Sequence, residues 1–116
     1  MSQEFDHLTQ ALRNLGGVEH VVGELQRVLR SVTDYDARTG SDLVGTLKTY
    51  VESGGNLAST ADALFLHRNS VSYRLQRIQD MSGIDPRDPR TRRVLMVAFA
   101  VTEHAPPTQD AAHPLP

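Results

Sequence analysis

Residues 56–83 read NLASTADALFLHRNSVSYRLQRIQDMSG and decide the fold of the chain. Asn56 is a favoured N-cap, because its side-chain oxygen can accept hydrogen bonds from the first free backbone N–H groups of a helix over 57–64. A longer helix over 67–82 follows a short corner, and Gly83 ends it. Two helices joined by a tight corner, the second rich in arginine, are typical of a helix-turn-helix. The stretch therefore predicts a second helix shaped to enter the major groove of DNA.

The helix predicted over 67–82 has one apolar face. On a wheel of 100° per residue, Val71, Leu75 and Ile78 fall within about 60° of one another and form the expected buried stripe. The other faces carry polar or charged side chains: Arg68, Asn69, Ser70, Ser72, Tyr73, Arg74, Gln76, Arg77 and Asp80. Arg can bridge guanine O6 and N7, and Asn or Gln can pair with adenine N6 and N7. Because Asp80 would repel phosphate, we expect only roughly the first two or three turns to approach DNA.

The corner at 65–67 reads Phe-Leu-His, which is too apolar for a solvated loop. We expect Phe65 and Leu66 to tuck under the domain where the backbone turns. The alternative for the helix that follows is an ordinary basic surface helix with no partner. The composition of the corner favours the helix-turn-helix.

Length and composition limit the classes of protein to which the chain can belong. Its 116 residues, 39% of them hydrophobic and 5% aromatic, suit one small helical domain. The absence of Cys excludes disulfides, thiolate metal sites and a Cys nucleophile. No apolar run approaches the ~18 residues of a membrane span, and the acidic start is unlike a signal peptide. We therefore expect a cytoplasmic protein with no membrane partner.

The charges of the chain are unevenly distributed. The formal net charge of −2 argues at first against a nucleic-acid partner. Residues 1–65 hold five basic and nine acidic residues, a balance of −4, whereas residues 66–94 hold seven arginines and three aspartates, a balance of +4. Such a local excess is the footprint of a phosphate-contacting surface. A solvated charged face is the alternative for any run of like charges.

Helical periodicity extends to the segments before the central stretch. Apolar residues recur at helical spacing over 3–15 and over 18–32, with Gly23 inside the second segment. The two segments could form a helical hairpin, a dimerisation element or the end of a preceding domain. Residues 33–40, TDYDARTG, break the pattern and predict a connection.

A further helix is predicted directly before the central stretch. Ser41 or Asp42 offers its N-cap, and apolar residues follow at helical spacing up to Val51. Gly54-Gly55 ends the helix, and one of these glycines suits the left-handed position beyond a helix end.

The last predicted helix covers about 89–102. Asp88 is its expected N-cap, and Pro89 stands at the first helical position, where its missing N–H is not needed. The residues beyond Arg93 are apolar on most sides, which predicts a central place in the core. The arginines near its start are solvated or make auxiliary contacts with the DNA backbone: Arg87, Arg90, Arg92 and Arg93. From 105 onward four prolines and the lack of periodicity predict a disordered tail.

These motifs resemble a known family. Positions 42–101 are similar to the C-terminal helix-turn-helix domain of PucR-type transcriptional regulators, the purine-catabolism and sugar-diacid regulator group. The resemblance rests on GGN-L-x-x-T-A-x-A-L, on H-R-N-[ST]-x-x-Y-R-L-x-R-I, and on the closing SGIDPRDPRTRRVLMVAFA. The core of the stretch also resembles the DNA-binding domains of the nucleoid protein Fis and of bacterial enhancer-binding activators. The resemblance implies an all-α fold, a small helical bundle containing a Fis-like helix-turn-helix.

Three regions follow from these patterns. Residues 1–36 are expected to form N-terminal helical segments that link or dimerise. Residues 37–103 are expected to form the helix-turn-helix DNA-binding domain, with 67–82 as its recognition helix. Residues 104–116 make up the predicted tail.

The resemblance also implies roles for individual residues. It assigns DNA contact to seven of them: His67, Arg68, Asn69, Ser70, Tyr73, Arg74 and Arg77. His67 would cap the helix or contact a phosphate, Arg68 and Asn69 would read bases, and Ser70 would contact a phosphate. Ser72 and Gln76 complete the expected DNA-binding face, but family members often carry arginine at these two positions. Because each phosphate contact that is missing flattens the salt dependence by about 0.9 log unit per log unit of salt, we expect weak binding by one copy.

The same resemblance implies the partners. The Fis and enhancer-binding relatives bind double-stranded DNA as dimers with their second helices in successive major grooves, so we expect a homodimer on a site with two half-sites. No cofactor or metal is expected. Such regulators usually carry a large sensory region before this domain. The chain would then be either a fragment or a short stand-alone gene product.

Three other functions are weighed against a sequence-specific regulator. A Fis-like architectural protein would bend DNA with relaxed sequence preference. A helical interaction or dimerisation module with weak or no DNA binding would fit the acidic total, although Arg68, Asn69 and Arg74 argue against it. An enzyme lacks support, because the chain has no Gly-rich phosphate loop, no His pair at metal-ligand spacing and no motif for a Ser or Cys nucleophile.

Overall fold

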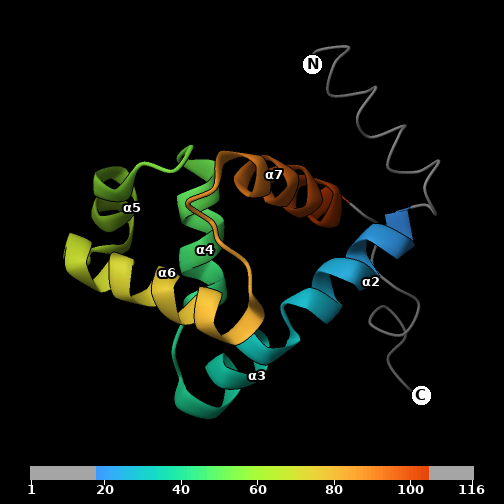
Figure 1. Cartoon of the computed structure of the whole chain (residues 1–116), viewed down its shortest axis with the longest axis horizontal. Coiled ribbons are helices and arrows are strands. Elements are labelled where there is room, and N and C mark those ends of the chain that lie inside the picture. Colours follow the sequence, from blue (N-terminus) through green and yellow to red (C-terminus); the bar gives the residue numbers. More distant parts are fainter. Residues whose placement is uncertain (1–17, 105–116) are drawn as a thin grey trace, which may run out of the picture.

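The computed structural model describes residues 18–104, and six α-helices make up that part of the chain (Figure 1). In chain order they are α2 (Val18–Val28), α3 (Arg30–Thr39), α4 (Leu43–Glu52), α5 (Leu57–Leu64), α6 (Arg68–Ser82) and α7 (Pro89–His104). No strand occurs among the described residues, so the predicted all-α class is confirmed. The helix predicted over 3–15 and the tail predicted from 105 onward lie outside these residues.

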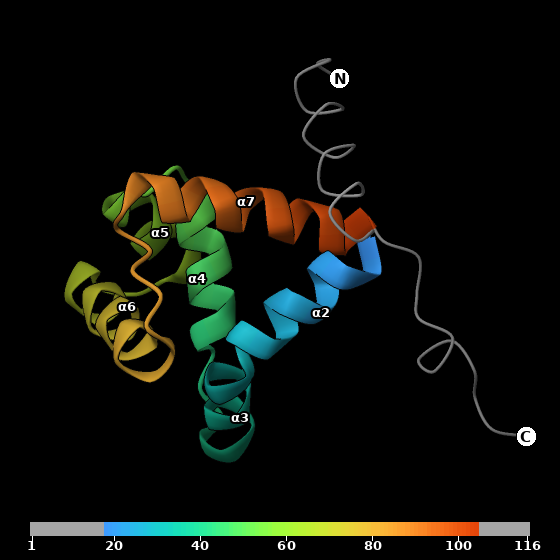
Figure 2. The same ribbon diagram turned by 45° about the vertical axis from the view of Figure 1, so that its right-hand side comes forward.

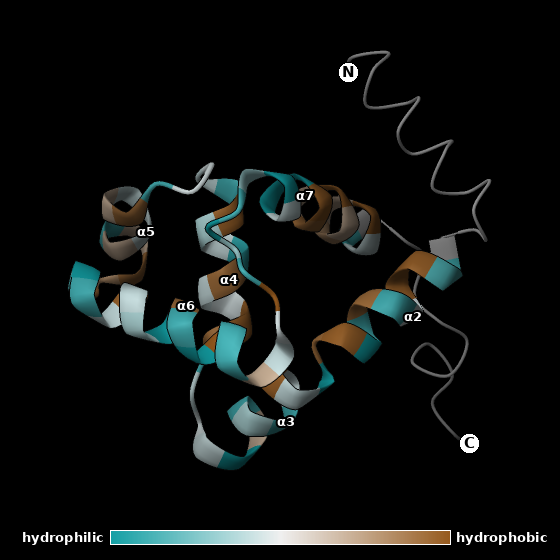
Figure 3. Ribbon diagram, in the orientation of Figure 1, coloured by the Kyte–Doolittle hydropathy of each residue, from teal (hydrophilic) through white to brown (hydrophobic). Residues whose placement is uncertain are grey.

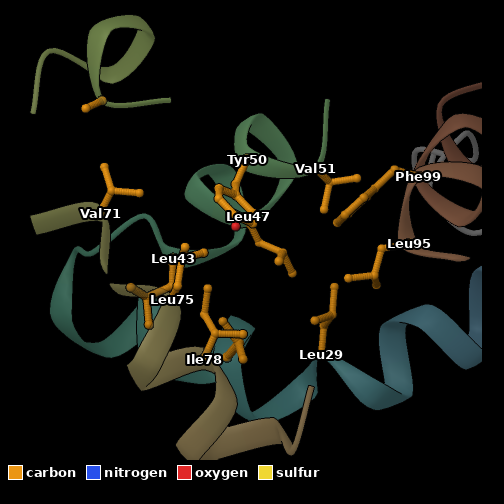
Figure 4. Close-up of a cluster of buried hydrophobic side chains, with 12 residues drawn as sticks. Leu29, Leu43, Leu47, Tyr50, Val51, Val71, Leu75, Ile78, Leu95 and Phe99 are labelled. Carbon is orange, nitrogen blue, oxygen red and sulfur yellow. The ribbon is translucent and has the colours of Figure 1, made fainter. Parts of the chain in front are cut away.

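Helix α4 lies at the centre of the fold, and α3, α5, α6 and α7 all pack against it (Figures 1 and 2). Its residues Leu47 and Val51 have no exposed surface. Buried side chains from several helices surround them in Figure 4: Leu29, Leu43, Val71, Leu75, Ile78, Leu95 and Phe99. A single contiguous core therefore joins the first and last described helices to the helix-turn-helix.

The helix ends around the central stretch follow the predicted capping residues. Asp42 caps α4, because its Oδ1 accepts a hydrogen bond from the Gly45 backbone N–H at 3.1 Å. Asn56 caps α5 in the same way, with 2.8 Å between its Oδ1 and the Ser59 nitrogen. Gly83 follows α6 in the left-handed conformation, at a φ of 78°. These side chains satisfy backbone groups that a helix end leaves without an intrahelical partner.

The corner between α5 and α6 differs from the prediction at Phe65. Leu66 is half-buried and packs against the core, as expected, but Phe65 is 93% exposed. The prediction that Phe65 tucks under the domain is therefore wrong. Its φ is 56°, and its side chain consequently leaves the helix surface at the point where the chain reverses. The Leu66 N–H donates to the Ala61 oxygen at 2.9 Å and closes the corner.

Residues 33–40, expected to be a connection, belong mostly to α3. The helix runs to Thr39, and of residues 33–40 only Gly40, whose φ is 72°, lies outside it. Val32 is fully buried in this helix, and Tyr35, one turn later, packs against the core. Ser31 Oγ donates to the Met81 oxygen at 3.1 Å and ties α3 to the last turn of α6. Two apolar contacts on one face hold a segment in helix although its sequence is rich in polar residues.

The segment expected to be periodic over 18–32 is divided between α2 and α3. The break between the two helices lies at Leu29, which is 4% exposed. Helix α2 passes through Gly23 without interruption. The chain turns at Leu29, so α2 extends away from α3 and packs along α7 (Figure 2).

Helix α7 begins at the predicted residues, but only part of it is buried in the core. The Asp88 Oδ1 accepts from the Arg90 N–H at 3.1 Å, and Pro89 is the first helical residue. Leu95 and Phe99 enter the core, whereas Val94 is 64% exposed.

An ion pair joins α4 to α7. Lys48 Nζ donates a hydrogen bond of 2.7 Å to the Glu103 carboxylate, which raises the pKa of Lys48 above its ordinary value. Within 18–104, none of the helices has both the length and the apolar character needed to cross a bilayer.

Replacing Leu47 should test the central position of α4. Because Leu47 is fully buried, Leu47→Ala should lower the free energy of unfolding by about 2–5 kcal/mol, through reduced burial and the cavity left behind. Urea denaturation followed by circular dichroism measures it. Glu52→Ala, at an exposed position of the same helix, should change the free energy by less than about 0.5 kcal/mol. Equal effects at the two positions would contradict the packing.

Replacing Phe65 should show that its conformation is strained. A left-handed backbone costs a non-glycine residue about 1–2 kcal/mol, and glycine removes most of that cost while adding entropy to the unfolded chain. Phe65→Gly should therefore leave the free energy of unfolding unchanged or raise it by up to about 1 kcal/mol. Ala63→Gly, at an exposed helical position two residues earlier, should lower it by about 1 kcal/mol. A clear loss of stability in Phe65→Gly would mean that the ring makes a contact that its exposure does not indicate.

Candidate nucleic-acid interface

The start of α6 is fixed by His67. This residue is the N-cap of the helix, with extended backbone, and its Nδ1 accepts from the Asn69 N–H at 3.0 Å. The imidazole therefore satisfies one of the free N–H groups at the helix start. Of the two roles implied for His67 by the resemblance, capping is the one that the structure contains.

The rotation of α6 about its own axis is set by its buried stripe. Val71, Leu75 and Ile78 have no exposed surface, as predicted. Consequently the exposed residues of the helix lie on the side away from the core: Arg68, Asn69, Ser70, Tyr73, Gln76 and Asp80. In Figure 3, α6 is largely hydrophilic on the side toward the viewer, in contrast with the apolar segments of α2 and α7. The helix thus presents Arg, Asn and Gln, the side chains suited to base edges, to solvent.

Ser72 and Gln76, the two positions at which the resemblance implies arginine in other family members, lie differently. Gln76 is exposed, and its Nε2 donates to Asp80 Oδ1 at 3.0 Å one turn later. Ser72 is half-buried, and its backbone oxygen accepts from Arg87 Nη2 at 3.3 Å. Arg87, from the loop before α7, therefore lies beside α6 and adds a guanidinium group to that edge of the helix.

Arg74 and Arg77 are half-buried on the flank of α6 that faces α3 and α4. Arg74 Nη1 donates to the Thr46 Oγ1 of α4 at 2.9 Å. The guanidinium carbon of Arg77 stands 5.1 Å from the centre of the Tyr35 ring of α3, a distance at which a cation is attracted to an aromatic ring. The Arg77 Nε is buried and has no hydrogen-bond partner in the structure. These two arginines thus have partners within the fold, whereas Arg68 at the start of the helix is exposed.

A surface hollow of 370 Å³ lies between α6 and the corner that joins α3 to α4. Its lining residues come from both sides: Tyr35, Ser41, Leu43, Leu66, Asn69, Ser70, Tyr73, Arg74 and Arg77. It therefore joins five of the predicted DNA-contact residues to Tyr35 and Ser41, which the sequence analysis missed. A sequence pattern could have indicated Tyr35: it follows Val32 by three residues, and this spacing places both side chains on one face of a helix.

The other arginines near the start of α7 have different environments. Arg92 Nη1 lies 3.4 Å from the backbone oxygens of both Pro86 and Arg87, so it stabilises the loop before α7. Arg90 and Arg93 are exposed and border an apolar groove of 840 Å³ between α2 and α7.

The arginines of α6 have no acidic partner in the described structure. Within 18–104, the ion pairs are Arg27–Glu24, at 2.8 Å, and Lys48–Glu103, and both lie outside α6. The hydrogen bond and charge of Arg27 lower the pKa of Glu24 below its ordinary value. In the same part of the chain, no group of three or more His, Cys, Asp or Glu side chains is placed to hold a metal ion. The positive charge of α6 is therefore free to attract an anionic partner.

Comparison with known proteins agrees with this geometry. A family model described as the PucR C-terminal helix-turn-helix domain matches residues 43–101, which cover α4 to α7. The chain belongs to this family. It is therefore a helix-turn-helix domain of the kind that DNA-binding transcription regulators carry, as its motifs predicted.

Curated relatives extend the match beyond the family model. An uncharacterized protein of Mycobacterium tuberculosis is 38% identical over 94 residues, which are 81% of this chain and 22% of that protein. The purine catabolism regulatory protein of Bacillus subtilis is 38% identical over 57 residues, 49% of this chain and 11% of the relative. The carbohydrate diacid regulator of Escherichia coli is 36% identical over 58 residues, 50% of this chain and 15% of the relative. The chain thus spans about a fifth or less of the length of these proteins, and no solved structure gives a significant match.

Proposed function

We propose that this chain is the DNA-binding part of a bacterial transcriptional regulator and that α6 is its recognition helix. The observation that supports this most strongly is the outward face of α6, where Arg68 stands exposed with no ion-pair partner among the described residues, beside the exposed amides of Asn69 and Gln76. Such a face matches the pattern of donors and acceptors in the major groove. The relatives that are named as regulators support the same function.

The proposed roles follow from position along α6. Arg68 and Asn69 lie in the first turn, which in a helix-turn-helix reaches base edges, and they read the sequence. His67 and Ser70 lie beside them and contact the backbone, while Tyr73 and Gln76, one turn further, contact the groove wall. Ser72 contributes a hydroxyl at the edge of α6 that lies beside Arg87. Arg74 and Arg77 approach phosphates from the flank.

We propose that two copies act together on a site with two half-sites. A single α6 with Ser72 and Gln76 in place of arginines offers few phosphate contacts, and pairing two weak sites restores affinity. Residues 37–103 are proposed as the DNA-binding domain and 1–36 as the linking or dimerising region. Since α3 is continuous from Arg30 to Thr39, its first half would move with the domain. We also propose that the regulator acts in the cytoplasm and that it carries a sensory region outside this chain.

A helical interaction module is the second candidate, favoured by the apolar groove between α2 and α7. Helices α2 and α7, which supply most of the lining of that groove, lie apart from α6 (Figure 2), so an interaction there is compatible with DNA binding. It therefore competes with the proposal only if α6 has no affinity for DNA.

Selection of bound duplexes from a random pool tests the function. The chain should enrich a palindromic motif whose half-sites are about one helical turn apart, because two copies place their recognition helices in successive major grooves. Enrichment of bent or A·T-rich duplexes without a shared motif would favour the architectural protein. The absence of any enrichment over non-specific background would favour the interaction module.

Replacing Arg68 tests base readout. Arg68→Ala should weaken binding to the selected duplex by about 1–3 kcal/mol and should relax the preference at one base pair. Arg93→Ala is the matched control, since it removes the same charge from an exposed site on α7. Fluorescence anisotropy with the selected and a scrambled duplex measures both variants. If the two variants lose the same affinity for both duplexes, Arg68 contributes only charge and does not read a base.

A further inference from the structure

We infer that the hollow between α3 and α6 binds a backbone phosphate of DNA, with Arg77 and Arg74 as its ligands and Tyr35 and Arg38 of α3 completing the site. This inference rests on the proposed DNA binding and adds a contact from outside the helix-turn-helix. The contact is sequence-independent, because it involves the phosphate and no base edge.

The state of Arg77 is the first observation that points to an anion. Its guanidinium carbon lies 5.1 Å from the Tyr35 ring centre, and its Nε is buried with no hydrogen-bond partner. Because this Nε has no accessible surface, only the terminal nitrogens of the Arg77 guanidinium, in the lining of the hollow, could meet an anion. A phosphate oxygen at the mouth of the hollow would neutralise the guanidinium charge and accept from its free N–H groups.

A second observation is the gathering of positive charge around one ring. The guanidinium carbon of Arg38 stands 5.8 Å from the same Tyr35 centroid, so two cations share the ring. Arg74 lines the hollow beside Arg77. None of the three arginines forms an ion pair within residues 18–104. Like charges repel one another, and an anion beside Arg74 and Arg77, the two arginines that line the hollow, would lower that repulsion.

Asp80, one turn after Arg77 on α6, accepts from Gln76 Nε2, and two acidic residues of the corner between α3 and α4 are engaged with backbone. Both carboxylate oxygens of Asp36 accept hydrogen bonds at the start of α4, from Leu43 N–H at 2.9 Å and from Val44 N–H at 3.0 Å. Asp42 Oδ1 accepts from the Gly45 N–H. These carboxylates are held at the N-terminus of α4, so they do not serve as counter-ions for the arginines.

The other lining groups fit a phosphate of DNA. Ser41 and Ser70 supply hydroxyl donors, and Tyr73 and Asn69 connect the hollow to the exposed face of α6. A duplex that receives Asn69 in its groove would carry its backbone past the flank of the helix where Arg74 and Arg77 stand. Tyr35, Arg38 and Ser41 all precede residues 43–101, so the family match does not include this half of the site.

The salt dependence of DNA binding tests the site. Affinity for the selected duplex is measured over a range of salt concentrations for the natural chain and for Arg38→Gln, Tyr35→Leu and Arg77→Ala. Removal of one phosphate contact should reduce the slope of log K against log salt by about 0.9. Arg30→Gln is the matched control, because it removes an exposed arginine from the other end of α3 and should leave the slope unchanged. Preference among bases should be the same in all variants.

Two comparisons separate the site from simpler explanations. If Tyr35 acts by holding Arg77, the double variant Tyr35→Leu/Arg77→Ala should show no greater reduction in slope than Arg77→Ala alone. Thermal melts establish that each variant is folded, and Arg38→Gln, at an exposed residue, keeps the test valid if Tyr35→Leu unfolds. Equal slopes for Arg38→Gln, Arg30→Gln and the natural chain would overturn the inference while leaving DNA binding intact. Failure of the natural chain to bind any duplex would instead remove the proposed function as well.

Inorganic phosphate distinguishes a DNA phosphate from a free anion. Phosphate stabilises folded proteins in general more than chloride does, so at matched ionic strength its effect on the melting temperature should be the same for the natural chain and for Tyr35→Leu, because an isolated phosphate lacks the other contacts of a duplex. A rise that depends on Tyr35, together with unchanged DNA slopes, would show that the hollow is a site for a small anion and would overturn the inference.

Discussion

The packing of Val71, Leu75 and Ile78 onto α4 is the contact on which the rest of the site depends. Each side chain is fully buried, and burial of such a side chain is worth about 1.5–3 kcal/mol. Together they contribute roughly 5–9 kcal/mol, comparable with the ~5–15 kcal/mol that keeps a typical domain folded. Rotation of α6 about its axis would expose these three residues and bury arginines. The direction in which the recognition face points is therefore fixed by the core.

The same core explains how an acidic chain can carry a basic surface. The stripe directs Arg68 outward and places Arg74 and Arg77 on the flank toward α3, while the carboxylates of Asp36 and Asp42 are bound to backbone N–H groups of α4. Acidic groups used as helix caps stabilise the fold at short range and leave the arginines unpaired. The net charge of such a protein therefore does not indicate whether it has a basic surface. The position of each charged residue relative to the helix ends does.

Local chemistry made most of the fold predictable. The caps at Asp42, Asn56 and Asp88 and the stop at Gly83 depend on residues a few positions apart, so sequence alone locates them. The part of α3 after Val32 was missed because its hydrophobic signal is small: Tyr35 stands among polar residues, and its burial depends on packing against other helices. Phe65 was misplaced because apolar character was taken to mean burial, whereas its left-handed backbone turns the ring toward solvent. The hollow needs side chains about forty residues apart, Tyr35 and Arg77, and no local pattern relates them.

The central claim is that DNA contacts α6 and the adjacent end of α3. The most direct measurement is a titration of the isotopically labelled chain with the selected duplex, followed by amide chemical shifts in NMR spectra. The account predicts that the largest shifts fall on residues 67–77, with a second group at 35–41, and that α2 and the last turns of α7 change little. Shifts concentrated on α2 and α7, with α6 unperturbed, would contradict it and would place the binding surface at the apolar groove instead.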